Sequence, residues 1–211
     1  MARLLNNPLG SISGKAGTLV FKKTKHGNFI SSLPVPSNKK PSEPQLLQRN
    51  KMKVIMHFLG PLKHILKLLF SPNRPTSASF HFIKSYYLLH GLHFGTQGYE
   101  INYATSLMSY GDLRPPEQAF AQWDGAQEVL LEWNPQSEQA LAHAEDYLFA
   151  VVYHPPTHQF FFAPQLAVRN EGLTSFLLPS PWSSFTSYKL WIGFHQLEAQ
   201  KASMSVYMGE L

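Results

Sequence analysis

The chain of 211 residues contains no cysteine. This absence excludes disulfide bonds, thiolate metal ligands, a cysteine nucleophile and a lipoprotein anchor. Small secreted domains usually carry disulfides, so a cytoplasmic protein is expected. No signal peptide is expected, because Asn6, Asn7 and Pro8 follow directly after Leu4 and Leu5. A signal peptide needs an apolar run of roughly 7–15 residues.

Long hydrophobic runs are missing as well. The most apolar stretch, Val54–Phe70, is interrupted by histidines, lysines, a glycine and a proline. A membrane-spanning helix needs roughly 20 predominantly apolar residues. The sequence therefore predicts no membrane span.

Patterns typical of enzymes and of metal sites are also missing. The segment Gly10–Lys15 is one residue shorter than the phosphate-binding pattern G-x-x-x-x-G-K-[ST] and lacks its magnesium-binding hydroxyl. Adjacent residues of a strand point to opposite faces, so Glu145 and Asp146 are poorly placed as a catalytic pair. A cross-strand pair of His154 and His158 is geometrically possible, but zinc needs three or four close ligands. We therefore expect that the protein is not an enzyme. We also expect no catalytic residue, no cofactor and no metal site.

Acidic residues are scarce in the first third of the chain. Residues 1–75 carry 13 basic residues and one acidic residue, whereas residues 76–211 carry five basic and 12 acidic residues. A basic segment of this kind faces either a polyanion or an oppositely charged part of the same fold or assembly. The candidate binding residues are nine of its 13 basic side chains: Lys15, Lys22, Lys23, Lys25, Lys39, Lys40, Arg49, Lys51 and Lys53.

Residues 1–75 are predicted to form a β-hairpin, a proline-rich linker and a helix. Alternating residues in Gly17–Leu33 predict the hairpin, with Leu19 and Phe21 on the same face. Four prolines then indicate an extended linker. Apolar residues at helical spacing predict a helix from Gln45 to Phe70, and Gly60-Pro61 should kink it or divide it into two helices.

Residues 76–211 are predicted to form a mainly antiparallel, immunoglobulin-like β-sandwich, which places the whole chain in the α+β class. Short apolar runs alternate there with Gly, Pro, Asn and Asp turn signals. Proline residues 155–156 close the clearest hairpin. Strands are expected at Tyr99–Ser109, Gln118–Trp123, Glu128–Trp133, Tyr147–His154, Gln159–Pro164, Gly172–Leu178, Tyr188–Gln196 and Ser203–Met208.

Two domains are thus predicted, residues 1–75 and residues 76–211. Trp182 and Trp191 are expected in the sandwich core, near Phe162, Phe176 and Phe194. Two questions stay open from the sequence. Residues 80–95 fit either a helix or a strand, and the helical third either packs on the sandwich or stands apart.

Four segments occur in order along the chain: GSISGKAGTLVFKK, LPVPSNKKPSEPQLLQRNKMKVIMHFLGPLK, DYLFAVVYHP and SMSVYMGEL. In these segments the chain resembles an uncharacterised family of Bacteroidota proteins of about this length, a domain of unknown function. Relatives tend to have threonine in an N-P-x-T-x-x-Q stretch, where this chain has Ser42 after Pro41 and so keeps the hydroxyl. The resemblance covers nearly the whole chain and implies no activity, cofactor or substrate.

Two functional hypotheses from different classes follow. The first is a non-enzymatic structural or assembly protein that contacts another copy of itself or another protein. It rests on the opposite charges of the two parts and on the extended linker, which is suited to lie across a neighbour. The second is a nucleic-acid-binding protein that uses the basic N-terminal third.

Overall fold

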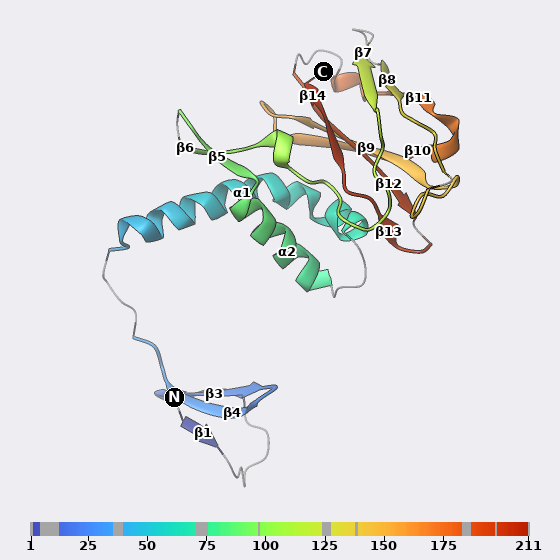
Figure 1. Cartoon of the computed structure of the whole chain (residues 1–211). Coiled ribbons are helices and arrows are strands. Elements are labelled where there is room, and N and C mark those ends of the chain that lie inside the picture. The colour runs from blue at the N-terminus through green and yellow to red at the C-terminus, as the bar shows by residue number, and fades with distance from the viewer. Residues whose placement is uncertain are drawn as a thin grey trace. The chain divides into compact units, whose positions relative to one another are not determined.

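The computed structural model (Figure 1) describes residues 2–4, 13–35, 40–70, 76–96, 98–123, 128–137, 139–182, 187–196 and 198–210. The chain divides into two compact units, Met1–Ser42 and Glu43–Leu211. Each unit has its own secondary structure and is described by itself.

The unit Met1–Ser42 contains a four-stranded antiparallel sheet. Its strands are β1 (Ala2–Leu4), β2 (Gly14–Ala16), β3 (Leu19–Thr24) and β4 (Gly27–Ser32), in the order β1-β4-β3-β2. A two-residue turn joins Thr24 to Gly27, which has a φ of 124° that favours glycine. The Thr24 hydroxyl donates to the Gly27 carbonyl at 3.0 Å and so stabilises the turn. The predicted N-terminal hairpin is confirmed.

Two helices begin the unit Glu43–Leu211. Helix α1 (Glu43–Leu69) continues through Pro61 without dividing, and its ribbon bends along its course in Figure 1. Helix α2 (Thr76–Leu89) ends before strand β5 (Leu92–Gly95), so residues 80–95 are partly helix and partly strand. Within the described part of the chain, no helix is long and apolar enough to cross a membrane.

The rest of this unit consists mainly of antiparallel sheets. The largest sheet has the order β10-β9-β12-β13, with β14 also paired to β12; a second has the order β11-β8-β7, and β5 pairs with β6. The strands are β6 (Gly98–Ile101), β7 (Phe120–Trp123), β8 (Glu128–Glu132), β9 (Tyr147–His154), β10 (Gln159–Val168), β11 (Leu173–Leu177), β12 (Lys189–Gln196), β13 (Lys201–Ala202) and β14 (Val206–Glu210). Three short 3-10 turns are η1 (Tyr103–Thr105), η2 (Arg169–Glu171) and η3 (Ser180–Trp182).

The largest sheet is covered on both faces. Alternate residues of β9 and β12 pack on the helices, including Phe149, Val151 and Trp191. The residues between them, such as Ala150 and Ile192, pack on the sheet β11-β8-β7. Burial on both faces explains why β9 and β12 are almost continuously apolar in sequence. The α+β class and the sheet-rich, mainly antiparallel C-terminal part are confirmed.

The two tryptophans expected in the core are both buried, on opposite faces of the largest sheet. Trp182 packs with Phe176 and Phe194 between the two sheets, whereas Trp191 packs on the helix side. Phe162 lies on the helix side as well. A strand that is buried on both faces sends its alternate side chains into two different cores.

Helix α1 belongs to the same unit as the sandwich, although the sequence grouped it with the basic residues 1–75. Its apolar stripe is buried, with Phe58 at 5.1 Å from Tyr153 of β9, measured between ring centroids. The open question of its packing is thereby answered. The boundary between the compact units lies at the linker before Glu43.

Candidate functional site

The N-terminal sheet has two chemically different faces. Strand register places Phe21 opposite Ile30, with Leu19 on the same face. The other face carries Lys22 opposite Phe29, and Lys15 opposite Val20. Directly opposed residues of a sheet share a face and neighbours along a strand alternate. The predicted faces of the hairpin are therefore confirmed.

Burial in this unit is low on both faces. No described side chain of Met1–Ser42, over residues 13–35 and 40–42, is buried. Leu19 is 43% exposed, and Val35 in the linker is 89% exposed. The apolar residues of the sheet thus gain little of the stabilisation that a covered core provides.

The nine candidate basic residues do not all share one surface. Lys15 and Lys22 share a face, Lys23 lies on the opposite face, and Lys25 lies in the turn. Lys40 is exposed in the linker, and Lys39 falls outside the described residues. The remaining three, Arg49, Lys51 and Lys53, lie on α1 in the other unit.

A cleft of about 930 Å³ lies beside α1, and we call it the α1 cleft. Its walls come from the first half of α1, the β5–β6 hairpin, η1, the β9–β10 turn and β14. Aromatic rings dominate the lining: Phe58, Phe94, Tyr99, Tyr103, Tyr153 and Tyr207. The polar groups include Asn50, Lys53, His57, Glu100 and His158. A concave, aromatic surface with a few polar groups is typical of ligand sites.

Three polar side chains that line the α1 cleft contact one another in a row. Tyr153 Oη and His158 Nδ1 are 2.9 Å apart, and the His158 ring meets the His57 ring at 4.4 Å between centroids. Burial raises the pKa of the Tyr153 hydroxyl, and the neighbouring Tyr103 raises it further. Tyr153 therefore remains a neutral hydrogen-bonding group at physiological pH.

His154 and His158 do not converge on one site. His154 is buried between the sheets near Tyr188, and its Nδ1 lies 2.8 Å from Thr157 Oγ1. His158 faces Tyr153 and the α1 cleft instead. Over the described residues, no three His, Asp or Glu side chains come together in a way that could hold a metal.

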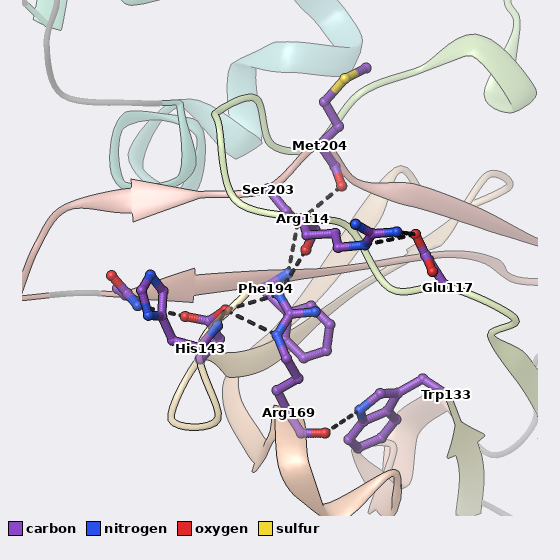
Figure 2. A network of polar contacts seen from close by, with 10 residues as sticks. Arg114, Glu117, Trp133, His143, Arg169, Phe194, Ser203 and Met204 are labelled. Atoms are coloured by element: carbon purple, nitrogen blue, oxygen red, sulfur yellow. Dashed lines mark hydrogen bonds and ion pairs between the residues drawn. The ribbon is translucent and has the colours of Figure 1, made fainter. Parts of the chain in front are cut away.

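A buried ion pair, absent from the sequence predictions, joins Asp146 to Arg169. Figure 2 shows the polar contacts around Arg169. Asp146 Oδ2 accepts from Arg169 Nε at 3.0 Å and Nη2 at 2.9 Å, and the two side chains are 0% and 2% exposed. Arg169 Nη2 also donates to the Arg114 carbonyl at 2.7 Å, and its carbonyl accepts from Trp133 Nε1 at 2.8 Å. The guanidinium lies 3.8 Å from the Phe194 ring centroid. Both charged groups are enclosed and hydrogen-bonded, so this network joins five chain segments inside the fold.

Neither the α1 cleft nor the ion pair carried a strong local signal. Asp146 looked like an ordinary turn residue, and 23 residues separate it from Arg169. From the sequence, only the predicted basic residues Lys51 and Lys53 of α1 indicated this region. Lys53 lines the cleft, and Lys51 Nζ lies 4.6 Å from the Tyr99 ring centroid.

Comparison with known proteins places the chain in a family without adding a function. No curated protein matches the sequence significantly. Residues 11–209 match a family of unknown function, DUF6266. Because the match covers nearly the full length, the chain belongs to this family of unknown function.

Proposed function

We propose that this chain is a non-enzymatic assembly protein that contacts another copy of itself through the N-terminal sheet. One observation carries the proposal. No described side chain of Met1–Ser42 is buried, although Leu19, Phe21 and Ile30 share one face of the sheet. An apolar sheet face is normally stabilised by packing against a second layer.

The sheet has little means of being stable alone. Chains below about 40 residues usually need disulfides, metals or association to fold, and Met1–Ser42 contains no cysteine. Covering the apolar face stabilises it by roughly 25 cal/mol for each Å² removed from water. Association therefore contributes the free energy that a buried core would otherwise contribute.

Charge favours an acidic surface as the partner. Met1–Ser42 has seven basic residues and no acidic one, whereas Glu43–Leu211 has 11 basic and 13 acidic residues. Complementary charge speeds association and selects the partner. In a second copy, the unit Glu43–Leu211 has a small excess of acidic residues (11 − 13 = −2), so the sheet of one copy would dock on that unit of the next. Head-to-tail contacts of this kind form rings or open assemblies.

The test is the oligomeric state of a surface variant. Leu19→Asp with Ile30→Asp should keep Glu43–Leu211 folded and abolish self-association in light scattering at low salt. All four tryptophans lie in Glu43–Leu211, so their fluorescence reports the folding of that unit. Leu89→Asp is the matched control, because Leu89 is an exposed leucine outside the N-terminal sheet. A wild-type chain that stays monomeric would contradict the proposal.

The opposite face of the sheet supports a second candidate function, nucleic-acid binding. Lys15 and Lys22 lie there with Phe29, and basic groups beside an aromatic ring suit a phosphate backbone and its bases. Lys15→Glu with Lys22→Glu should abolish binding in gel-shift assays at about 50 mM salt. Lys23→Glu, on the other face, should have a smaller effect. Absence of any wild-type shift with DNA or RNA would exclude this function.

A further inference from the structure

We propose that the α1 cleft binds a nucleotide, with the base stacked on Phe94 and the phosphate held by Lys53. The site lies entirely within Glu43–Leu211. The inference is therefore independent of assembly through the N-terminal sheet.

The first support is an aromatic pair in which one ring, Phe94, is exposed and the other, Tyr99, is half-buried. Phe94 and Tyr99 stand opposite each other in the β5–β6 hairpin, with ring centroids 5.3 Å apart and planes at 82°. Phe94 is 73% exposed at the rim of the cleft. Phenylalanine is usually among the more buried residue types. An exposed ring in a cleft offers a flat apolar surface, and stacking on such a ring is the common way in which proteins bind bases.

The second support is positive charge beside these rings. Lys53 lines the cleft and forms no ion pair with a carboxylate of the described residues. Lys51 likewise lacks such a pair, and its ammonium lies over the Tyr99 ring. The cleft's own carboxylate, Glu100, lies 3.8 Å from His93. Because the Lys53 ammonium has no carboxylate partner among the described residues, the cleft favours a ligand that is anionic as well as flat.

The third support is the volume of the α1 cleft and the polar side chains that line it. The volume of about 930 Å³ is sufficient for a nucleotide, since small-molecule sites measure roughly 300–1,000 Å³. Asn50, His57 and His158 line the cleft and offer hydrogen bonds to base edges or sugar hydroxyls. The hydrogen bond between Tyr153 and His158 holds one of these rings in place. Stacking, charge and hydrogen bonding thus occur in one cavity.

The test measures binding of defined probes to the full chain. Fluorescein-labelled dT and U oligomers of about 12 nucleotides report binding by anisotropy at about 50 mM salt. AMP and UMP are added as competitors and titrated by calorimetry. Phe94→Ala should weaken binding roughly 5- to 150-fold, the range expected from loss of one stacked base. Lys53→Glu should weaken binding and reduce its salt dependence.

Matched variants separate this site from other surfaces. Phe120→Ala removes a phenylalanine that is 58% exposed on β7, and Lys67→Glu changes an exposed lysine of α1 that does not line the cleft. Neither control should change affinity by more than about twofold, since neither side chain reaches the ligand. Competition by AMP or UMP identifies free nucleotides as ligands. Binding of the oligomers alone identifies a nucleic-acid strand as the source of the nucleotide.

Three results would overturn the inference. The first is that no probe binds the wild-type chain. The second is that Phe94→Ala and Lys53→Glu, shown to be folded by unchanged tryptophan fluorescence, bind as wild type does. The third is that a neutral hexasaccharide binds in a manner dependent on Phe94 while nucleotides do not. Loss of binding in Lys15→Glu with Lys22→Glu, with both cleft variants unaffected, would assign nucleic-acid contact to the N-terminal sheet and leave the assembly proposal untouched.

Discussion

Arg169 and Asp146 form an enclosed ion pair in which the two charges lie directly against each other. Asp146 Oδ1 also accepts from Gln196 Nε2 at 2.6 Å, and Oδ2 accepts from the His143 amide at 3.0 Å. Removing one member of such a pair leaves a buried charge without its counterion. At this position chain stability depends on both residues being present.

Arg169→Met should lower the free energy of unfolding by about 3–5 kcal/mol, because Asp146 would remain buried without its cation. Arg114→Ala is the control. Its ion pair with Glu117 is partly exposed, so its loss should cost less than about 1 kcal/mol. Urea unfolding followed by tryptophan fluorescence measures both values. Equal losses in the two variants would show that enclosure of the pair has no energetic consequence.

His195 makes stability depend on pH. It is 2% exposed, its Nε2 donates to the Pro164 carbonyl, and its Nδ1 has no hydrogen-bond partner among the described residues. Burial lowers the pKa of His195 below its ordinary value. The unfolded chain therefore binds a proton more readily than the folded chain does, so stability is lost as pH falls below about 6.5.

His195→Gln keeps a side-chain donor and removes the titration. Between pH 7 and pH 5, roughly the range in which an unfolded histidine gains its proton, the variant should lose less unfolding free energy than the wild type. Urea unfolding at several pH values within that range measures the difference. A variant whose stability falls as steeply as that of the wild type would place the acid sensitivity elsewhere.

At the scale of elements, two glycines mark opposite surroundings. Gly60 lies inside α1 beside Pro61, and a Cβ added there would meet nothing within 4 Å. Gly193 lies in β12 opposite Phe149, where a Cβ would come within 2.6 Å of that ring. Gly60 therefore has room for a side chain and lowers the stability of the helix. Gly193 leaves space for the Phe149 ring.

Gly60→Ala should therefore raise the free energy of unfolding by about 0.5–1 kcal/mol, the usual difference between glycine and alanine in a helix. Gly193→Ala should lower it by about 1–3 kcal/mol through overpacking against Phe149. Urea unfolding of the two variants and of the wild type shows whether each change raises or lowers the free energy of unfolding. Destabilisation by Gly60→Ala would show instead that the bend of α1 requires glycine beside Pro61.

At the scale of the whole molecule, both apolar cores lie in Glu43–Leu211. A chain that begins at Glu43 should therefore fold with a urea midpoint close to that of the full-length protein. It should also lose self-association, because the proposed contact lies in Met1–Ser42. Tryptophan fluorescence and light scattering check the two outcomes. Unfolding of the truncated chain would mean that Met1–Ser42 stabilises the rest.

The sequence by itself determined the class of the fold and most strand positions. Tyr147–His154 was predicted with its observed bounds, because apolar runs and turn-forming prolines are local signals. Local signals also placed the N-terminal hairpin and its faces. The ambiguity of residues 80–95 reflected a real change from α2 to β5 within that window.

Only the tertiary structure decided which distant residues meet. Asp146 and Arg169 meet because β9 and β10 pair, and a turn-like aspartate carries no sign of such a partner. The α1 cleft is lined by α1, the β5–β6 hairpin, η1, the β9–β10 turn and β14, which are spread over most of the sequence. The basic residues of the first third were predicted as one group because net charge was counted over a continuous stretch of sequence. They were separated because the apolar stripe of α1 packs on the sheet, whereas the N-terminal strands form a unit of their own.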